Sequence, residues 1–95
     1  MVTVAEPAAE AGRMARLLLA EAAEVEQRRM ALSRYALVWW QGEAAEAYQR
    51  RVHERVSALA ALVARLQAAA RLWQALEDAA REVSVAADAG GPEWR

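Results

Sequence analysis

Apolar residues recur at three- and four-residue steps along two long stretches of the chain. In the second stretch, at about 43–86, they form a continuous stripe: Ala45, Tyr48, Val52, Val56, Leu59, Leu62 or Val63, Leu66, Ala69 or Ala70, Trp73, Leu76, Ala80 and Val83. In the first, at about 8–38, the stripe is narrower: Ala11, Met14 or Ala15, Leu18, Ala22, Val25, Leu32 and Ala36. These steps place side chains on one face of an α-helix, so each stretch is predicted to be an amphipathic helix.

Few residues interrupt the helical pattern. Pro7 suits a first helical turn, and the next proline is Pro92. A turn is expected at about 39–43, because only a reversal there lets the two stripes meet. Gly42 supplies the backbone freedom for it, including access to positive φ. The sequence therefore predicts an all-α antiparallel two-helix hairpin over 8–86, with an N-terminal tail at 1–7 and a flexible C-terminal tail at 87–95.

One hairpin does not cover all the apolar surface that the pattern predicts. Leu17, Leu19 and Met30 lie off the first stripe, and Arg29 falls on it. Pairing two hairpins into a four-helix bundle would cover the apolar residues, so we expect a dimer. Arg29 then requires an acidic partner or the bundle edge, which a second copy or a different small helical chain can provide. The interface candidates are Leu18, Val25, Leu32, Val52, Leu59, Leu66 and Trp73.

Composition and charge narrow the possible functions. The net charge of −1 disfavours binding to nucleic acid or to an anionic membrane. The chain lacks Cys, and His53 is its only histidine, so no metal site or other cofactor is expected. No serine has a plausible base constellation, so we do not expect an enzyme. A group of arginines is interleaved with glutamates, which favours a salt-bridged helix surface over a phosphate-binding face: Arg28, Arg29, Arg50, Arg51 and Arg55.

The predicted bend carries the triplet Trp40-Gln41-Gly42, a W-x-G motif, followed by the segment EAAEAY. A W-x-G triplet at the bend of a short helical hairpin, followed by small residues and then an aromatic, resembles the WXG-motif family of small type VII (ESX) secretion proteins. The likeness covers nearly the whole chain in length, bend position and helical pattern. It implies a hairpin that dimerises into a four-helix bundle. It also implies export without a cleaved signal peptide, from a cytoplasmic pool, or a role as partner of a larger effector.

The sequence departs from that family at its export signal. Exported members often carry Y-x-x-x-D/E near the end of the second helix, whereas Tyr48 is followed four residues later by Val52. The closest substitute is the pair Trp73 and Glu77, about one heptad nearer to W-x-G than the family pattern implies. This pair is either a degenerate export signal or a stripe aromatic beside a solvated acid. In the second case a partner chain would carry the signal.

A second reading does not involve secretion. The W-x-G triplet is then an ordinary helix turn with an aromatic plug, and the chain is a cytosolic coiled-coil adaptor or oligomerisation module. A nucleic-acid or membrane-surface binder is a third class, which the net charge disfavours. The first residues lack the pattern of a signal peptide, and the run MARLLLA is too short to span a bilayer, so no membrane span is expected.

Overall fold

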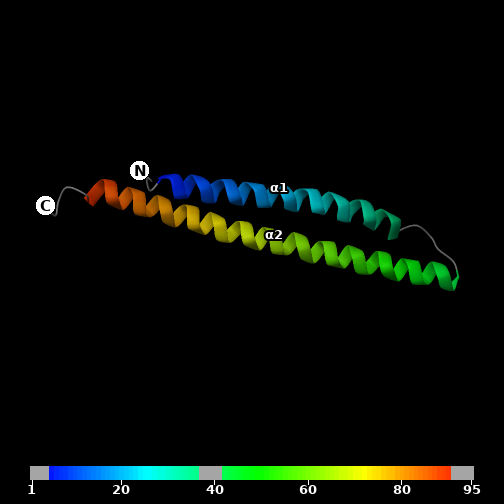
Figure 1. The fold of residues 1–95 in the computed structure, drawn as a ribbon. Coiled ribbons are helices and arrows are strands. Elements are labelled where there is room, and N and C mark those ends of the chain that lie inside the picture. Colours follow the sequence, from blue (N-terminus) through cyan, green and yellow to red (C-terminus); the bar gives the residue numbers. More distant parts are fainter. Residues whose placement is uncertain (1–4, 37–41, 91–95) are drawn as a thin grey trace.

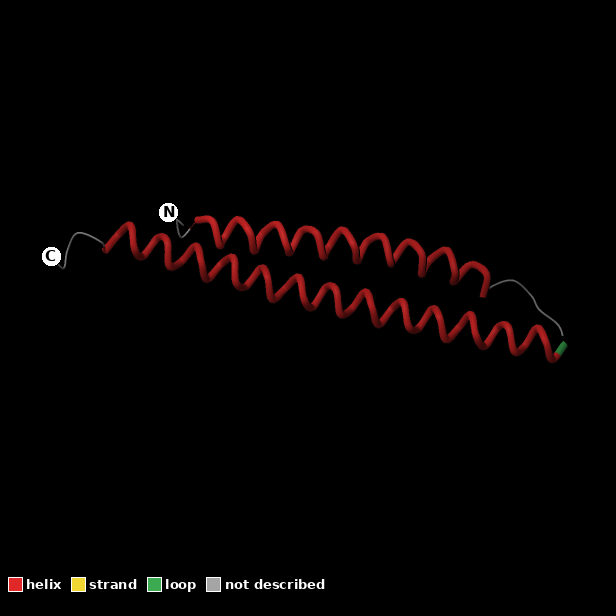
Figure 2. Tube along the Cα trace, viewed as in Figure 1, coloured by secondary structure: helices red, strands yellow, loops and turns green. Residues whose placement is uncertain are grey.

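Two antiparallel helices lie side by side along their lengths (Figure 1). The structure, a computed structural model, describes residues 5–36 and 42–90. Helix α1 spans Ala5–Ala36 and α2 spans Glu43–Gly90. Figure 2 shows the described chain as helix except at Gly42, beside the turn. The predicted all-α antiparallel hairpin is therefore confirmed.

The hairpin is long and thin. Its principal extents are 80 × 18 × 15 Å and its radius of gyration is 22.0 Å, against about 12 Å for a compact domain of this length. Its accessible surface is 7342 Å², whereas a compact protein of this mass exposes about 5400 Å². Helix α2 extends beyond α1 at both ends (Figure 1). Much of each helix therefore faces solvent.

Both helices extend further toward the chain ends than the sequence pattern predicted. Helix α1 begins at Ala5, before Pro7. The first turn of a helix leaves its N–H groups unbonded, so the missing N–H of proline removes no helical hydrogen bond there. Helix α2 continues to Gly90 through the run Ala86, Ala87, Asp88 and Ala89. Alanine is the strongest helix former, which explains why residues 87–90 are helical although they were expected to belong to a tail.

The two helices meet along seams in which steps of three and four residues alternate. In α1 the seam comprises Ala8, Ala11, Ala15, Leu18, Ala22, Val25, Arg29 and Leu32. In α2 it comprises Val52, Val56, Leu59, Val63, Leu66, Ala70, Trp73, Glu77, Ala80 and Ser84. This heptad spacing is that of a coiled coil. Its centre is the cluster of Ala22, Val25 and Val63, against which Leu59 and Leu66 pack.

The predicted stripe of α2 proves to be two faces rather than one. The seam passes through Val63, Ala70 and Glu77. The predicted stripe also contains Leu76 and Val83, with Leu62 as the alternative to Val63, yet all three are exposed. Each immediately precedes a seam residue and is therefore rotated from it by about 100° around the helix. Because both sets satisfy steps of three and four, only the position of α1 separates them.

Gly42 immediately precedes the first residue of α2. Its φ is +92°, in the left-handed region. Its carbonyl oxygen accepts a hydrogen bond from the Glu46 N–H at 2.9 Å. Glu43 and Glu46 follow in the first turn, where negative charge stabilises the helix end. A Cβ at Gly42 would have no heavy atom within 4 Å, so a side chain there would be opposed by backbone strain alone.

We predict that Gly42→Val lowers the free energy of unfolding by about 1–3 kcal/mol, because a β-branched residue resists positive φ. Gly42→Asn should cause a smaller loss, since asparagine tolerates positive φ better. Thermal melts followed by circular dichroism measure both variants. An unchanged melting temperature for Gly42→Val would show that the turn does not require the glycine.

Candidate functional site

The most distinctive surface of the hairpin is a second apolar line along α2. It runs parallel to the seam with α1, and its larger members are exposed, with Leu72 at 74%, Val83 at 58% and Leu76 at 52%. We call this line the outer seam: Leu62, Ala69, Leu72, Leu76, Ala79 and Val83. Its residues also follow heptad spacing, the geometry with which helices pack against other helices. The described part of the hairpin leaves these side chains exposed except for Ala69, which is half-buried.

Leu17 of α1 lies beside the middle of the outer seam. Gly12 is opposite Glu77. In an antiparallel pair, moving five residues along α1 corresponds to moving five back along α2, which places Leu17 level with Leu72. Both residues immediately precede a seam residue, and in antiparallel helices such positions lie on the same side of the hairpin. Leu17 is 64% exposed, so it widens the apolar surface on that side.

The charged residue on the α1 seam finds its partner within its own helix. The Arg29 Nε donates to Glu26 Oε2 at 2.8 Å, and its Nη2 donates to Oε1 at 2.5 Å. These hydrogen bonds lower the pKa of Glu26 and raise the pKa of Arg29, because each stabilises the charged form. Both side chains remain partly exposed. Arg29 therefore does not require an acid from a second chain, contrary to the expectation from sequence.

Trp73 and Glu77 do not form an exposed aromatic–acid pair. Trp73 is half-buried in the seam, and the side chain of Glu77 is only 16% exposed. The Glu77 carboxylate lies against Gly12, where an added Cβ would approach its Cδ to 2.9 Å. Arg81 Nη2 donates a hydrogen bond to Glu77 Oε2 at 3.1 Å. Trp73 lies on the apolar stripe, as one of the two sequence hypotheses predicted. Glu77 is shielded by α1, whereas that hypothesis expected a solvated acid.

The residues proposed from sequence as a dimer interface lie in the seam between α1 and α2. Val25 and Val52 are buried, and the others are half-buried: Leu18, Leu32, Leu59, Leu66 and Trp73. They hold the hairpin together. The sequence reading did not separate the outer seam from them. Adjacent apolar residues such as Leu62 with Val63, and Leu72 with Trp73, are the signal that two faces are present.

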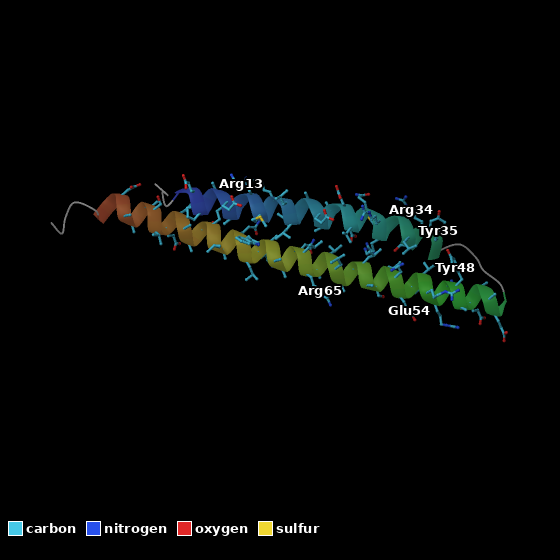
Figure 3. The ribbon with its side chains drawn as sticks, viewed as in Figure 1. Arg13, Arg34, Tyr35, Tyr48, Glu54 and Arg65 are labelled. Atoms are coloured by element: carbon cyan, nitrogen blue, oxygen red, sulfur yellow. The ribbon has the colours of Figure 1, made fainter. Side chains whose placement is uncertain are left out.

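The turn end of the hairpin has a different chemistry. Tyr35 and Tyr48 lie close to each other there (Figure 3). Arg51, Glu54 and Arg55 line a shallow hollow nearby. Within residues 5–36 and 42–90, no group of three or more His, Cys, Asp or Glu is placed to hold a metal ion. Trp40 of the W-x-G triplet lies outside the described residues.

The hydropathy of α2 is high for so exposed a helix. The stretch Glu43–Asp88 contains an 18-residue window that is long and apolar enough, by length and composition, to cross a membrane. Only 11% of that window is buried in the hairpin. Arg65 and Arg71 lie near the middle of the stretch, where a bilayer would oppose charge. The same hydropathy suits a helix that packs against other helices.

Comparison with known proteins gives no family model that matches the chain, no matching curated protein and no matching solved structure. The resemblance to the WXG-motif family therefore depends on the residues of the chain itself.

The bidentate pair predicts a specific titration. The pKa of Glu26 should lie below its ordinary value and should rise in Arg29→Gln, measured by isotope-edited NMR. Because the folded-state pKa is lowered, the pair stabilises the fold above the unfolded-state pKa, and this stabilisation is lost as the pH falls through the folded-state value. Gln27→Ala, on the exposed surface of the same turn, is the control. An identical Glu26 pKa in Arg29→Gln and the unaltered chain would contradict the assignment.

Proposed function

We propose that this chain is a non-enzymatic interaction protein of type VII secretion, which dimerises into a four-helix bundle and is exported or accompanies a larger effector. The observation that carries the interaction role is the exposed outer seam of α2. The assignment to secretion is supported by the W-x-G triplet at the bend and by the extent of the resemblance along the chain.

The energetics of the outer seam favour a helical partner. Burial of apolar surface contributes about 25 cal/mol per Å², so covering several exposed leucines and valines contributes on the order of several kcal/mol. That is a large share of the stability of a small domain. The heptad spacing of the exposed residues matches the packing requirements of another helix. An oligomer is therefore the state in which this surface is stable.

The turn geometry supports the W-x-G reading in part. The glycine of the triplet, Gly42, takes a positive φ, and its carbonyl accepts the first described hydrogen bond of α2. Glycine adopts this positive φ without steric cost, whereas most other residues would be strained in the same backbone conformation.

A cytosolic coiled-coil adaptor is the alternative, and the outer seam supports it equally. The two proposals differ in whether the chain leaves the cell. A neighbouring gene for a type VII ATPase, or for a second small helical protein, would favour secretion.

Export in the native host tests the proposal. We expect the chain in the culture filtrate of the parent strain and its retention in a strain that lacks the type VII ATPase. Retention in both strains, with the protein stably produced, would favour the adaptor.

We further predict that Glu77→Ala leaves export unchanged, because the carboxylate lies against α1 and is poorly placed for recognition. The matched control is Glu54→Ala, which removes an exposed acid of the same helix. Immunoblots of filtrate and cell fractions measure export, and circular dichroism confirms the helix content. A selective loss of export in Glu77→Ala would instead identify Trp73 and Glu77 as the signal.

A further inference from the structure

The outer seam is nearly symmetric about Leu72. We propose that it binds the outer seam of a second copy of this chain, with the two α2 helices antiparallel and Leu72 at the two-fold axis. This inference rests on the interaction role proposed above, but it does not depend on secretion.

The register follows from the positions of the outer-seam residues. An antiparallel copy centred at Leu72 places Leu62 level with Glu82 and within one residue of Val83 of the second copy, and Ala69 level with Ala75 and within one residue of Leu76 of the second copy. Ala69 then packs near the larger Leu76, and Leu62 packs near Val83. A parallel pairing would instead place Ala69 opposite Ala69 and leave a gap in the contact.

Charge separates the two orientations further. Arg65 interrupts the outer seam and points away from α1 in Figure 3. In the antiparallel register it faces Ala79 of the second copy, about one turn from Glu82 of that copy. A parallel dimer would bring Arg65 and Arg55 each against their own copies, which is unfavourable.

The elongated shape leaves the chain with more exposed surface than a compact protein has. The hairpin exposes 7342 Å², about 1900 Å² more than a compact protein of its mass. A standard protein interface removes about 800 Å² from each partner. Leu17, level with Leu72 on the same side, extends the contact onto α1.

The opposite side of the hairpin is less suited to this contact. There Leu19 and Met30 of α1 are accompanied by His53, Gln67 and Gln74 of α2, all exposed. These polar side chains would need hydrogen-bond partners in a buried interface. Val85 of α2 is exposed on that side too, but the outer seam carries most of the large exposed apolar residues of α2: Leu62, Leu72, Leu76 and Val83.

Site-directed disulfide formation tests both the face and the register, because the chain contains no cysteine. Leu72→Cys should form intermolecular disulfides rapidly under mild oxidation, since residues at the axis approach within the Cα separation of about 4.4–6.8 Å that a disulfide requires. Leu19→Cys, exposed on the opposite side, is the matched control. A mixture of Ala69→Cys and Leu76→Cys chains should cross-link to each other faster than either chain to itself.

A charge substitution provides an independent readout. Leu72→Glu should raise the dimer dissociation constant by on the order of 100-fold or more, because two copies of the charge would meet at the axis. Light scattering coupled to size exclusion measures the dimer, and circular dichroism verifies that the variant remains helical. Leu19→Glu should leave the dimer intact.

Three results would overturn the inference. The first is cross-linking of Leu72→Cys no faster than that of Leu19→Cys. The second is a helical monomer of the unaltered chain at micromolar concentration, including one that binds lipid vesicles through this face. The third is an unchanged dimer in Leu72→Glu. A chain that is exported but fails these tests rejects the dimer alone, whereas one that cross-links as expected but is not exported rejects the secretion role alone.

Discussion

The close approach of α1 to α2 through small side chains determines how much of this protein can be buried. Ala8, Ala11, Ala15 and Ala22 supply half of the α1 seam, and Ala70 lies opposite in α2 with no exposed surface. Small residues let the helix backbones approach, but each removes little apolar area from water. The leucines and Trp73 of the seam are therefore only half-buried, and other large apolar side chains remain outside the contact. The extended shape and the outer seam both follow from that packing.

A second constraint is that α2 can pack only one of its faces against α1. Helix α2 carries apolar residues over a wider arc than a single partner covers, and its two seams are separated by about one residue in sequence. Polar residues within the seam are accommodated locally. Arg29 is paired with Glu26 one turn away, and Glu77 uses the space left by Gly12 and the hydrogen bond from Arg81. The two charged residues of the seam, Arg29 and Glu77, thus have partners within the hairpin, and an apolar surface is left along α2.

Periodicity and the glycine at the bend were enough to predict the hairpin, because both depend on local sequence. Local sequence could not predict which of Leu62 and Val63 faces α1, because either residue continues the spacing of three and four. The choice depends on where α1 lies, which is a tertiary contact. The same holds for Glu77: its shielding depends on Gly12, a residue far away in sequence on the other helix. The resemblance to the WXG-motif family depends on a short local motif, Trp40-Gln41-Gly42, and not on a tertiary contact.

The unequal lengths of the helices have a consequence for local stability. Helix α2 has 48 residues and α1 has 32, so α2 extends beyond its partner, and its residues 85–88, all exposed, are held mainly by helical hydrogen bonds. Isolated helical turns open readily, because helix formation is cooperative and most of its stability in proteins comes from packing. Amide hydrogens near Ala22, Val25 and Val63 should exchange most slowly with solvent, and those near Glu43 and Ala86 most rapidly. The free energy of local opening should therefore be highest around the cluster of Ala22, Val25 and Val63 and lower toward the C-terminal end of α2.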